Sequence, residues 1–248
     1  MSHDRLNFSV CPHDTAKNVA GWFLINTYLQ RRLERAIHFE PCENFNEERE
    51  RVLAGGYGIV YANPYSALRY CEQRQFIPVA RPAGIFDETL LIARAGQTLP
   101  AQRPLKIASA SDRLMVHFLG LTLLGKVGLS VADCQSQFVG NNLKVVQSVV
   151  NGSCELGFLF NETWQGLSAS TRANLQVLEQ TRSEQAFHCF CVGPELADRA
   201  DEVRQILCGM KDDPAGKRIL EDLRFAAFEP TDLDSVRHLA GLIEAASI

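Results

Sequence analysis

The sequence lacks both a long apolar run and a long basic run. A membrane-spanning helix needs about 20 consecutive apolar residues, and no stretch of this chain approaches that length. Surfaces that bind nucleic acid depend on clustered Lys and Arg, whereas here 29 acidic residues outnumber 25 basic ones and the net charge is −4. These absences argue against a helical membrane protein and give no support to a nucleic-acid partner.

No secretory leader is recognisable at the start of the sequence. Such a leader combines a charged start, an apolar stretch and a small-residue cleavage site, but Met1–Arg5 are polar and a strand-like segment follows directly. We therefore expect a cytoplasmic protein as the sequence stands, or a periplasmic one if its N-terminus was trimmed.

The eight cysteines form no CxxC pair, so the commonest zinc and redox motifs are missing. His188 stands beside Cys189 and Cys191, but strand alternation places the two cysteines on one face and His188 on the other. A tetrahedral site needs further ligands, and no second Cys/His pair stands ready to supply them. We expect reduced, packed cysteines, no metal site and no cofactor.

Short apolar runs alternate with amphipathic stretches along the whole chain, a pattern typical of open α/β sheets. Hydrophobic residues make up 46% and charged residues 22%, which are ordinary globular values. The pattern predicts strands at 6–11, 37–42, 57–62, 76–83, 88–94, 105–110, 137–140, 155–160, 175–179 and 187–192. It predicts helices at 15–35, 47–53, from 63–65 onward, and at 111–127, 142–151, 195–210, 215–223 and 233–245.

A Pro- and Gly-containing linker at 95–104 separates two such series. The predicted fold class is α/β and two-lobed, each lobe a mixed, mainly parallel sheet flanked by helices. Residues 1–94 with 190–248 form lobe 1 and 95–189 form lobe 2, with hinges near 93–97 and 187–192. Ligands of open α/β sheets bind beyond the carboxyl ends of strands, at helix N-termini, so we expect a small guest in a gap between the lobes.

Three segments carry a family resemblance. They are GGYGIVYANPYSALRY (55–70), VVNGSCELGFLFNETW (149–164) and ILEDLRFAAFEPTDLDSVRHL (219–239). In order and spacing they are similar to the phosphonate-binding proteins of ABC transporters over almost the whole chain. The resemblance implies a type II periplasmic-binding-protein fold, closure on a ligand, and delivery or sensing as the task. It implies a small polar ligand (phosphonate, phosphate, another oxyanion or a zwitterion) and an ABC permease or a signalling partner.

The ligand loop departs from the family pattern. The family ends a second-lobe strand in a Ser-Thr-Ser loop that grips phosphonate oxygens at a helix N-terminus, whereas this chain has IASASDRLMV (107–116), which puts Asp112, Arg113 and Leu114 near those positions. Asp87 or Phe86 stands in place of a family Tyr, and Asn142 in place of a family His. Because a carboxylate repels a phosphonate, a zwitterion, a cation or a small polar metabolite fits the loop at least as well.

In the first lobe, strand ends supply five further candidates: His13, Thr15, Tyr61, Asn63 and Tyr65. A ligand would meet an imidazole, a hydroxyl, an amide and an aromatic wall there. The alternative is structural: Asp14 or Thr15 caps the first helix, and the tyrosines pack on that helix.

In the second lobe the candidates are Ser109, Ser111, Asp112, Arg113, Asn141, Asn142, Glu155 and Glu162, together with Asp87. The serines replace part of the hydroxyl loop, or one of them only caps a helix. Both asparagines open the next helix, where capping and ligand contact are compatible. The resemblance implies that acidic residues near the last inner strand bind a ligand amine; otherwise Glu155 and Glu162 are a solvated strand end and a first-turn acid.

A binding or sensing protein is the leading functional prediction, and we expect no enzyme. An enzyme on the same fold, as in cofactor biosynthesis, stays open, with Cys11 and His13 as the only candidate pair. A lobe pair that has lost its ligand and serves as an interaction domain is a third possibility.

Overall fold

The computed structural model describes residues 6–246, except the side chain of Ala245. Met1–Arg5, the polar start noted above, lie outside the described residues. The chain forms two compact units: Met1–Ile85 with Phe187–Leu239 is unit 1, and Phe86–Ala186 with Ala240–Ile248 is unit 2. Among the described helices none is long and apolar enough to span a membrane.

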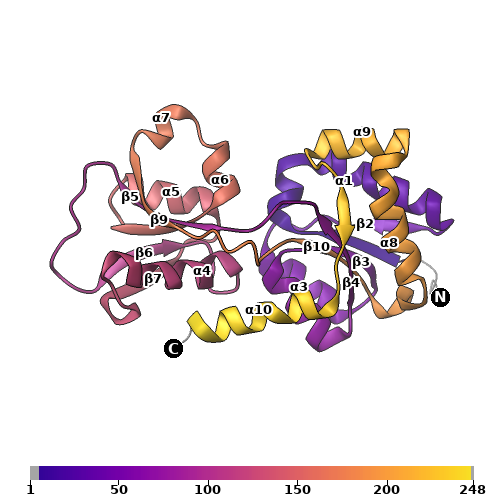
Figure 1. Ribbon diagram of the computed structural model, residues 1–248, viewed down its shortest axis with the longest axis horizontal. Helices are drawn as coiled ribbons and strands as arrows, with labels where there is room; N and C mark the ends of the chain where they lie inside the picture. The colour runs from indigo at the N-terminus through magenta and orange to yellow at the C-terminus, as the bar shows by residue number, and fades with distance from the viewer. Residues whose placement is uncertain (1–5, 247–248) are drawn as a thin grey trace. The chain divides into compact units, whose positions relative to one another are not determined.

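Unit 1 is built on a six-stranded sheet in the order β11-β4-β10-β3-β1-β2. β1 pairs in parallel with β2 and β3, whereas β10 runs antiparallel to β3 and β4, and β11 antiparallel to β4. Four strands, β1 to β4, therefore share one direction, and the sheet is mixed. Figure 1 labels β2, β3, β4 and β10 of this sheet. The strands are β1 (Leu6–Val10), β2 (Ile37–Phe39), β3 (Tyr57–Ala62), β4 (Ile77–Pro82), β10 (Cys189–Val192) and β11 (Phe228–Pro230).

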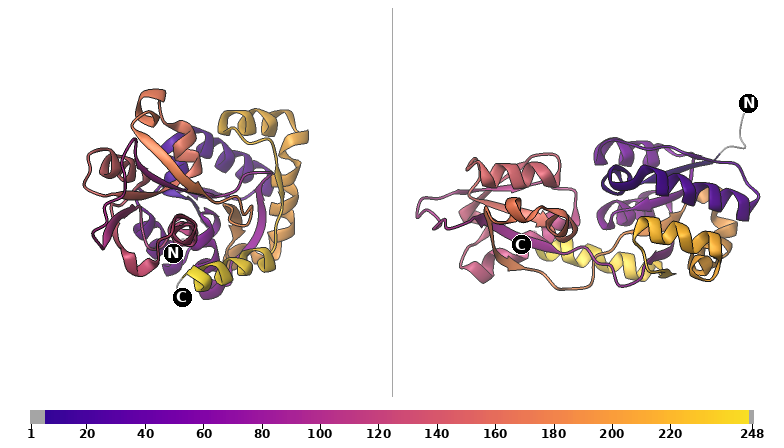
Figure 2. Two further views of the ribbon diagram at one scale, coloured as in Figure 1. Left: turned by 60° about the vertical axis from the view of Figure 1, so that its left-hand side comes forward. Right: turned by 90° about the horizontal axis from the view of Figure 1, so that it is seen from above.

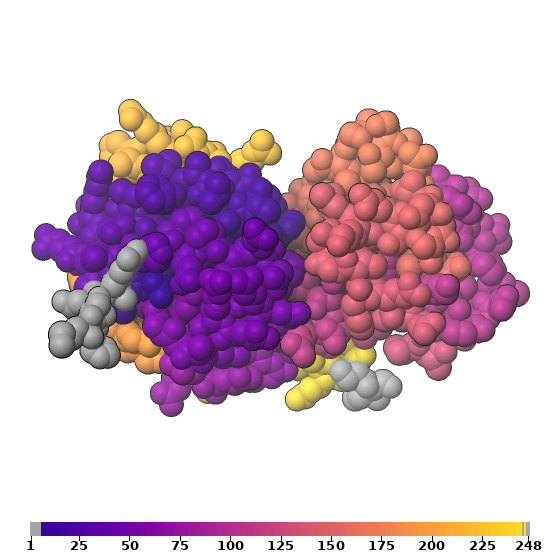
Figure 3. Space-filling view, turned by 180° about the vertical axis from the view of Figure 1, so that it is seen from behind, coloured from indigo at the N-terminus to yellow at the C-terminus, as the bar shows by residue number. Residues whose placement is uncertain are grey.

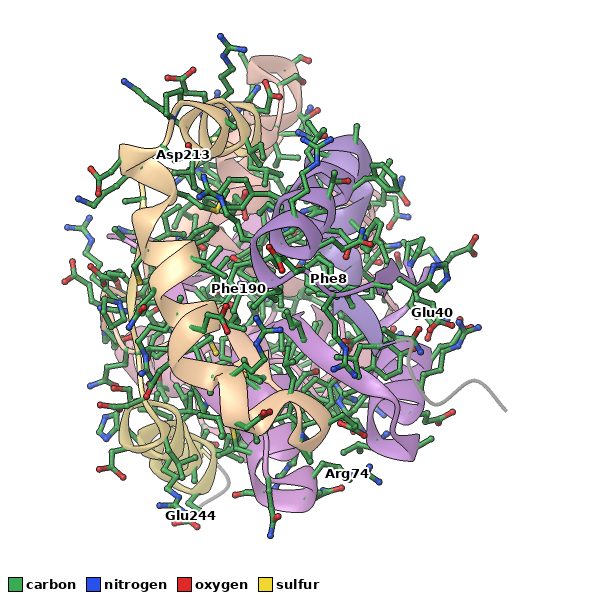
Figure 4. All side chains as sticks on the ribbon, turned by 90° about the vertical axis from the view of Figure 1, so that its right-hand side faces the viewer. Phe8, Glu40, Arg74, Phe190, Asp213 and Glu244 are labelled. Atoms are coloured by element: carbon green, nitrogen blue, oxygen red, sulfur yellow. The ribbon has the colours of Figure 1, made fainter. Side chains whose placement is uncertain are left out.

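One face of this sheet carries the apolar core of the unit. Helix α1 (Pro12–Leu33) packs there against both α8 (Ala200–Cys208) and α9 (Pro214–Leu223), which are the gold and orange helices beside the indigo segments in Figure 2. Phe8 and Phe190 have no exposed surface, and their rings stack at 6.2 Å between centroids. Figure 4 shows both in the interior, with Arg74 and Asp213 at the periphery. Burial of such aromatic side chains is the main stabilising contribution on this face.

The opposite face is covered by α2 (Phe45–Ala54) and α3 (Pro64–Arg74). Strand alternation turns Ser9 to this side, between the inward-facing Phe8 and Val10. The fully buried Ser9 hydroxyl donates to Glu48 Oε1 at 3.3 Å, and the Tyr70 hydroxyl donates to Oε2 at 2.6 Å. The surface of unit 1 seen in Figure 3 is formed mainly by these N-terminal segments, coloured indigo and purple.

Unit 2 has a five-stranded sheet in the order β7-β6-β8-β5-β9. β6 pairs in parallel with β7 and β8, and β5 is antiparallel to β8 and β9. The strands are β5 (Thr89–Arg94), β6 (Leu105–Ser109), β7 (Cys134–Phe138), β8 (Leu156–Phe160) and β9 (Leu175–Gln180). The sequence division at 94/95 places Thr89–Arg94 in the first lobe, whereas the structure has this strand in the sheet of unit 2.

Two helices sandwich this second sheet. α4 (Met115–Leu124) and α5 (Asn142–Val150) pack on opposite faces, because the neighbouring residues Phe158 and Gly157 of β8 face α4 and α5 respectively. The remaining elements of the chain are α6 (Asn161–Gly166), α7 (Ala169–Arg172), α10 (Leu233–Ala246) and the 3₁₀ turns η1 (Gly125–Val127), η2 (Val131–Asp133), η3 (Pro194–Arg199) and η4 (Gly209–Asp212).

The expected helix at 111–127 begins later than predicted. Ser111 does not cap it: the Ser111 hydroxyl accepts a hydrogen bond from Arg113 N–H at 3.1 Å and closes a local turn. Helix α4 starts at Met115, its N-cap is Leu114, and no side chain caps it. The serine therefore stabilises the turn before the helix, a competing use of the same hydroxyl.

Candidate functional site

In unit 1 the strand ends meet at one edge of the sheet. β1 and β3 are parallel, so the residues that follow them, Cys11 and Asn63, lie at the same edge. β10 starts there in the opposite direction, with Cys189 opposite Ala62, which brings His188 to the same place. The Cys11 N–H donates to the Tyr61 carbonyl at 2.7 Å and ties the two strand ends together.

The first turn of α1 is held by backbone groups. The N-cap is Cys11, which makes no side-chain cap bond, while Asp14 N–H and Thr15 N–H donate to the Cys11 carbonyl. The Thr15 hydroxyl donates to the Val10 carbonyl at 3.2 Å. The expected cap by Asp14 or Thr15 is therefore absent, and Thr15 uses its hydroxyl inside the turn. His13, in the same turn, is half-buried.

Among the candidates on β3 and α3, Tyr61 is the most enclosed. It is 2% exposed, its ring lies 4.5 Å from that of Trp22, and it stacks on His188 at 5.7 Å and 16°. Asn63 is the N-cap of α3: its Oδ1 accepts from Ser66 N–H at 3.0 Å. Tyr61 thus packs on the first helix, which the sequence offered as the alternative to ligand contact, and Asn63 caps α3 at the same edge.

Tyr65 lies in the first turn of α3, and two guanidinium groups contact its ring. Arg49 stands 5.0 Å and Arg69 5.1 Å from the centre of its ring. Cation–π contact with both groups favours this orientation of the ring. The Arg49 guanidinium also donates to the Ser66 hydroxyl, so the ring belongs to the same polar group as Asn63.

The side chains of His188 and Asp14 also lie at this edge, and neither was predicted as a site residue. His188 Nε2 lies 3.5 Å from Asp14 Oδ2, and both side chains are nearly buried, with exposed fractions of 10% and 9%. Burial raises the pKa of the Cys11 thiol, and a hydrogen bond with His188 opposes that shift. Sequence reasoning paired His188 with its chain neighbours and missed the partners that the β3–β10 pairing supplies.

In unit 2 a second group of candidates surrounds the ends of β6 and β7. Ser109 is 1% exposed, and its hydroxyl lies 3.2 Å from His117 Nδ1. Burial lowers the pKa of His117, and the Asp112 carboxylate opposes that shift. Asp112 and Arg113 are exposed, and Asp112 Oδ1 lies 3.4 Å from the Ser111 hydroxyl. No side chain caps the start of α4, which directly follows this loop, so the first N–H groups of the helix make no capping hydrogen bond with a side chain.

The asparagines at the start of α5 divide the expected roles between them. Asn141 is the N-cap, its Oδ1 accepting from Lys144 N–H at 2.9 Å. Asn142 is 7% exposed, and its Oδ1 is buried and accepts no hydrogen bond from the described residues. The N–H groups of Val139 and Gly140 donate to the carbonyls of Ser109 and Ala110, so this turn lies directly beside the Ser111–Arg113 loop.

The remaining three candidates of unit 2 do not lie together. Asp87 is 4% exposed and lies beside the carboxyl end of β8, because Thr89 pairs with Phe160. Glu162 is exposed in the first turn of α6, at that same edge. Glu155 precedes β8 and accepts from Lys106 N–H at 2.7 Å, so it lies at the opposite edge of the sheet. The structure therefore does not bring Glu155 to the other candidates.

A comparison with known protein families finds a match over most of the chain. A model of the periplasmic substrate-binding protein of phosphonate ABC transporters matches residues 8–236. A comparison with curated proteins finds no match.

Solved structures with the same fold include three that cover nearly this whole chain. PhnD1 of Prochlorococcus marinus, solved with methylphosphonate, is 13% identical, with a TM-score of 0.80 and 98% of both chains covered. A Xanthomonas citri protein, XAC2383, solved with chloride, is 18% identical, with a TM-score of 0.76 and coverage of 98% and 97%. A binding protein component of a Pseudomonas aeruginosa phosphonate ABC transporter is 12% identical, with a TM-score of 0.74 and coverage of 98% and 88%.

These matches confirm the predicted fold class and the predicted resemblance. The mixed two-unit α/β fold is that of type II periplasmic binding proteins, and the family consists of transporter binding components, not enzymes. The chain belongs to the family of periplasmic substrate-binding proteins of phosphonate ABC transporters.

Proposed function

We propose that this chain binds a small phosphonate that also carries an amine. The observation that carries the proposal is the composition of the loop beside the uncapped start of α4. Backbone N–H groups there attract an anion, while the Asp112 carboxylate and the buried, unsatisfied Asn142 Oδ1 attract a hydrogen-bond donor of positive charge. A zwitterion satisfies both kinds of group, whereas a simple phosphonate satisfies only the N–H groups and is repelled by Asp112.

Titration calorimetry with 2-aminoethylphosphonate and methylphosphonate tests the proposal. The wild-type chain should prefer the amine-bearing ligand. Asp112→Asn should weaken the binding of 2-aminoethylphosphonate about fivefold, because a partly exposed charge pair contributes about 1 kcal/mol. The same variant should strengthen the binding of methylphosphonate, because it removes a repulsive charge.

Glu155→Gln is the matched control, since it removes a carboxylate of the same unit from the far edge of the sheet. It should leave both affinities unchanged. A wild-type preference for methylphosphonate, or an equal loss of both ligands in Asp112→Asn, would overturn the proposal.

We propose that the protein delivers this ligand to an ABC permease on the outer side of the cytoplasmic membrane. Family membership supports it. Fractionation of source cells that express the gene with its natural N-terminus separates this role from a cytoplasmic sensor, because a transporter component is released with the periplasm and a sensor stays with the cytoplasm.

We also propose that the ligand leaves the protein unaltered, in contrast to an enzyme on the same fold. The family of transport components supports this. Phosphorus NMR of 2-aminoethylphosphonate incubated with the protein should show one unchanged resonance, and a growing product resonance would contradict the proposal.

A further inference from the structure

Three potential metal ligands converge at the β1–β3–β10 edge of unit 1. They are the Cys11 thiol, the Asp14 carboxylate and the His188 imidazole, and their ligand atoms all lie within 4.8 Å of one another. Cys11 ends β1, Asp14 is one helical turn further on, and His188 precedes β10. All three residues belong to unit 1, whereas the residues proposed above to bind a phosphonate belong to unit 2.

The cluster is enclosed and its charge is incompletely satisfied. Cys11 is 1% exposed and Asp14 is 7% exposed. Asp14 Oδ2 is buried and accepts no hydrogen bond from the described residues, although the Lys17 ammonium approaches the other oxygen at 3.6 Å. A buried carboxylate oxygen without a hydrogen bond is costly, and a bound cation would remove that cost.

We propose that Cys11, Asp14 and His188 bind a zinc ion. Thiolate, imidazole and carboxylate together suit zinc, whereas magnesium and calcium prefer oxygen ligands alone. Ligand atoms about 2.0 Å from a tetrahedral zinc lie about 3.3 Å apart, and His188 Nε2 and Asp14 Oδ2 are already 3.5 Å apart. Three protein ligands leave one position for water or another small ligand.

The charge balance favours the ion in this buried place. On binding, the Cys11 thiol releases its proton to solvent, and the thiolate and the Asp14 carboxylate together carry two negative charges. A divalent cation neutralises both, so the loaded cluster has no net charge and avoids the cost of a buried uncompensated ion.

Neighbouring groups hold two of the ligands in place. The Asn63 side-chain amide lies 3.9 Å from Cys11 Sγ and donates to it, while also donating to the Ser66 hydroxyl at 3.1 Å. The Tyr61 ring stacks on the His188 imidazole at 5.7 Å and 16°. Outer partners of this kind orient metal ligands in known sites, and their loss typically weakens metal binding about 10- to 100-fold.

The test uses the full-length, tag-free chain after treatment with a chelator. We expect one zinc per chain by competition with a chromophoric chelator, and a thiolate-to-cobalt charge-transfer band when cobalt(II) replaces zinc. Cys11→Ser should abolish the band and weaken zinc binding about a hundredfold or more, and Asn63→Ala should weaken it about tenfold.

Cys42→Ser and His38→Gln are the matched controls, because each removes the same type of ligand from unit 1 outside the cluster. Both should keep the band and the affinity. Should Cys11→Ser fail to fold, X-ray absorption of the zinc-loaded wild type decides: one sulfur with nitrogen or oxygen ligands is expected. No bound zinc, zinc without a sulfur ligand, or a folded Cys11→Ser that keeps the charge-transfer band would overturn the proposal.

Discussion

Glu48 of α2 carries a carboxyl group with no exposed surface, which accepts hydrogen bonds from the Ser9 and Tyr70 hydroxyl groups. Burial raises its pKa from 4.5 to about 7, and the hydrogen bonds from Tyr70 and Ser9 and the charge of Arg49 oppose that shift only in part. We therefore expect Glu48 to change charge between mildly acidic and neutral pH.

Glu48→Gln should flatten part of the pH dependence of stability. A folded pKa above the unfolded one means that the stabilising contribution is present below about pH 4.5 and is lost as pH rises through about 7. The difference corresponds to about 3 kcal/mol at most. Urea unfolding at pH 4.5 and at pH 8 measures the free energy of unfolding of the variant minus that of the wild type. This difference should be larger at pH 8 than at pH 4.5, by up to that amount.

Glu50→Gln, on the exposed side of the same helix, is the control and should show no such gain. If Glu48→Gln also tracks the wild type across this pH range, the buried carboxyl does not take up its proton as described.

Individual site residues were predictable where the signal was local. Asn63 before Pro64 indicated a strand end and a helix start, and Asn141 indicated a cap. The meeting of Asp14 with His188 was not predictable, because it depends on the antiparallel register that sets Cys189 opposite Ala62. Nothing in the sequence around either residue carries that register.

At the scale of the elements, Gly120 in α4 packs against the core, whereas Gly125, which follows the helix, contacts no neighbour at its Cβ position. A Cβ on Gly120 would lie 2.4 Å from the buried ring of Phe158. A Cβ on Gly125, the C-cap with φ −58, would meet nothing within 4 Å. Substitution of Gly120 therefore tests core packing, and substitution of Gly125 tests helix propensity without a packing change.

Gly120→Ala should lower the free energy of unfolding by about 1–3 kcal/mol, because the added methyl group overpacks the core. Gly125→Ala should raise it by up to about 1 kcal/mol, because alanine loses less conformational entropy. Chemical denaturation of both variants checks the opposite signs, and a stabilising Gly120→Ala would refute the tight packing of α4 on β8.

Most elements were predictable from apolar periodicity, and the errors have physical causes. β3 matches its predicted range because every residue in it is buried. β7 was predicted too late, since its sequence CQSQF is a half-exposed edge strand without an apolar run. β11 was missed because three residues ending in a proline carry no strand signal, and its pairing with β4 is long-range.

At the scale of the whole molecule, each unit has an apolar core of its own. Trp22 is buried in the core of unit 1, and Trp164 lies in α6 of unit 2. The chain has only these two tryptophans, so Trp164→Phe leaves a fluorescence reporter of unit 1 and Trp22→Phe leaves one of unit 2.

Gly120→Ala, introduced into both single-tryptophan variants, should lower the urea midpoint reported by Trp164 more than the midpoint reported by Trp22. The reason is that the overpacked methyl group lies in the core of unit 2 alone. Gly125→Ala serves as the control for a change at the same helix without overpacking. Equal shifts at both reporters would mean that the chain unfolds as one cooperative body.

The break of α1 at Asn18 divides the helix into a first turn beside Cys11 and a longer part that packs in the core. Asn18 leaves helical geometry at φ −155 and ψ 73, and its side chain accepts from Gly21 N–H, so the long part of the helix restarts there with a cap of its own. The single turn that carries Cys11, His13 and Asp14 is thereby a separate piece of backbone. A hydrogen bond nevertheless spans the break, because the Trp22 indole N–H donates to the Asp14 carbonyl at 3.2 Å and so holds this turn against the core.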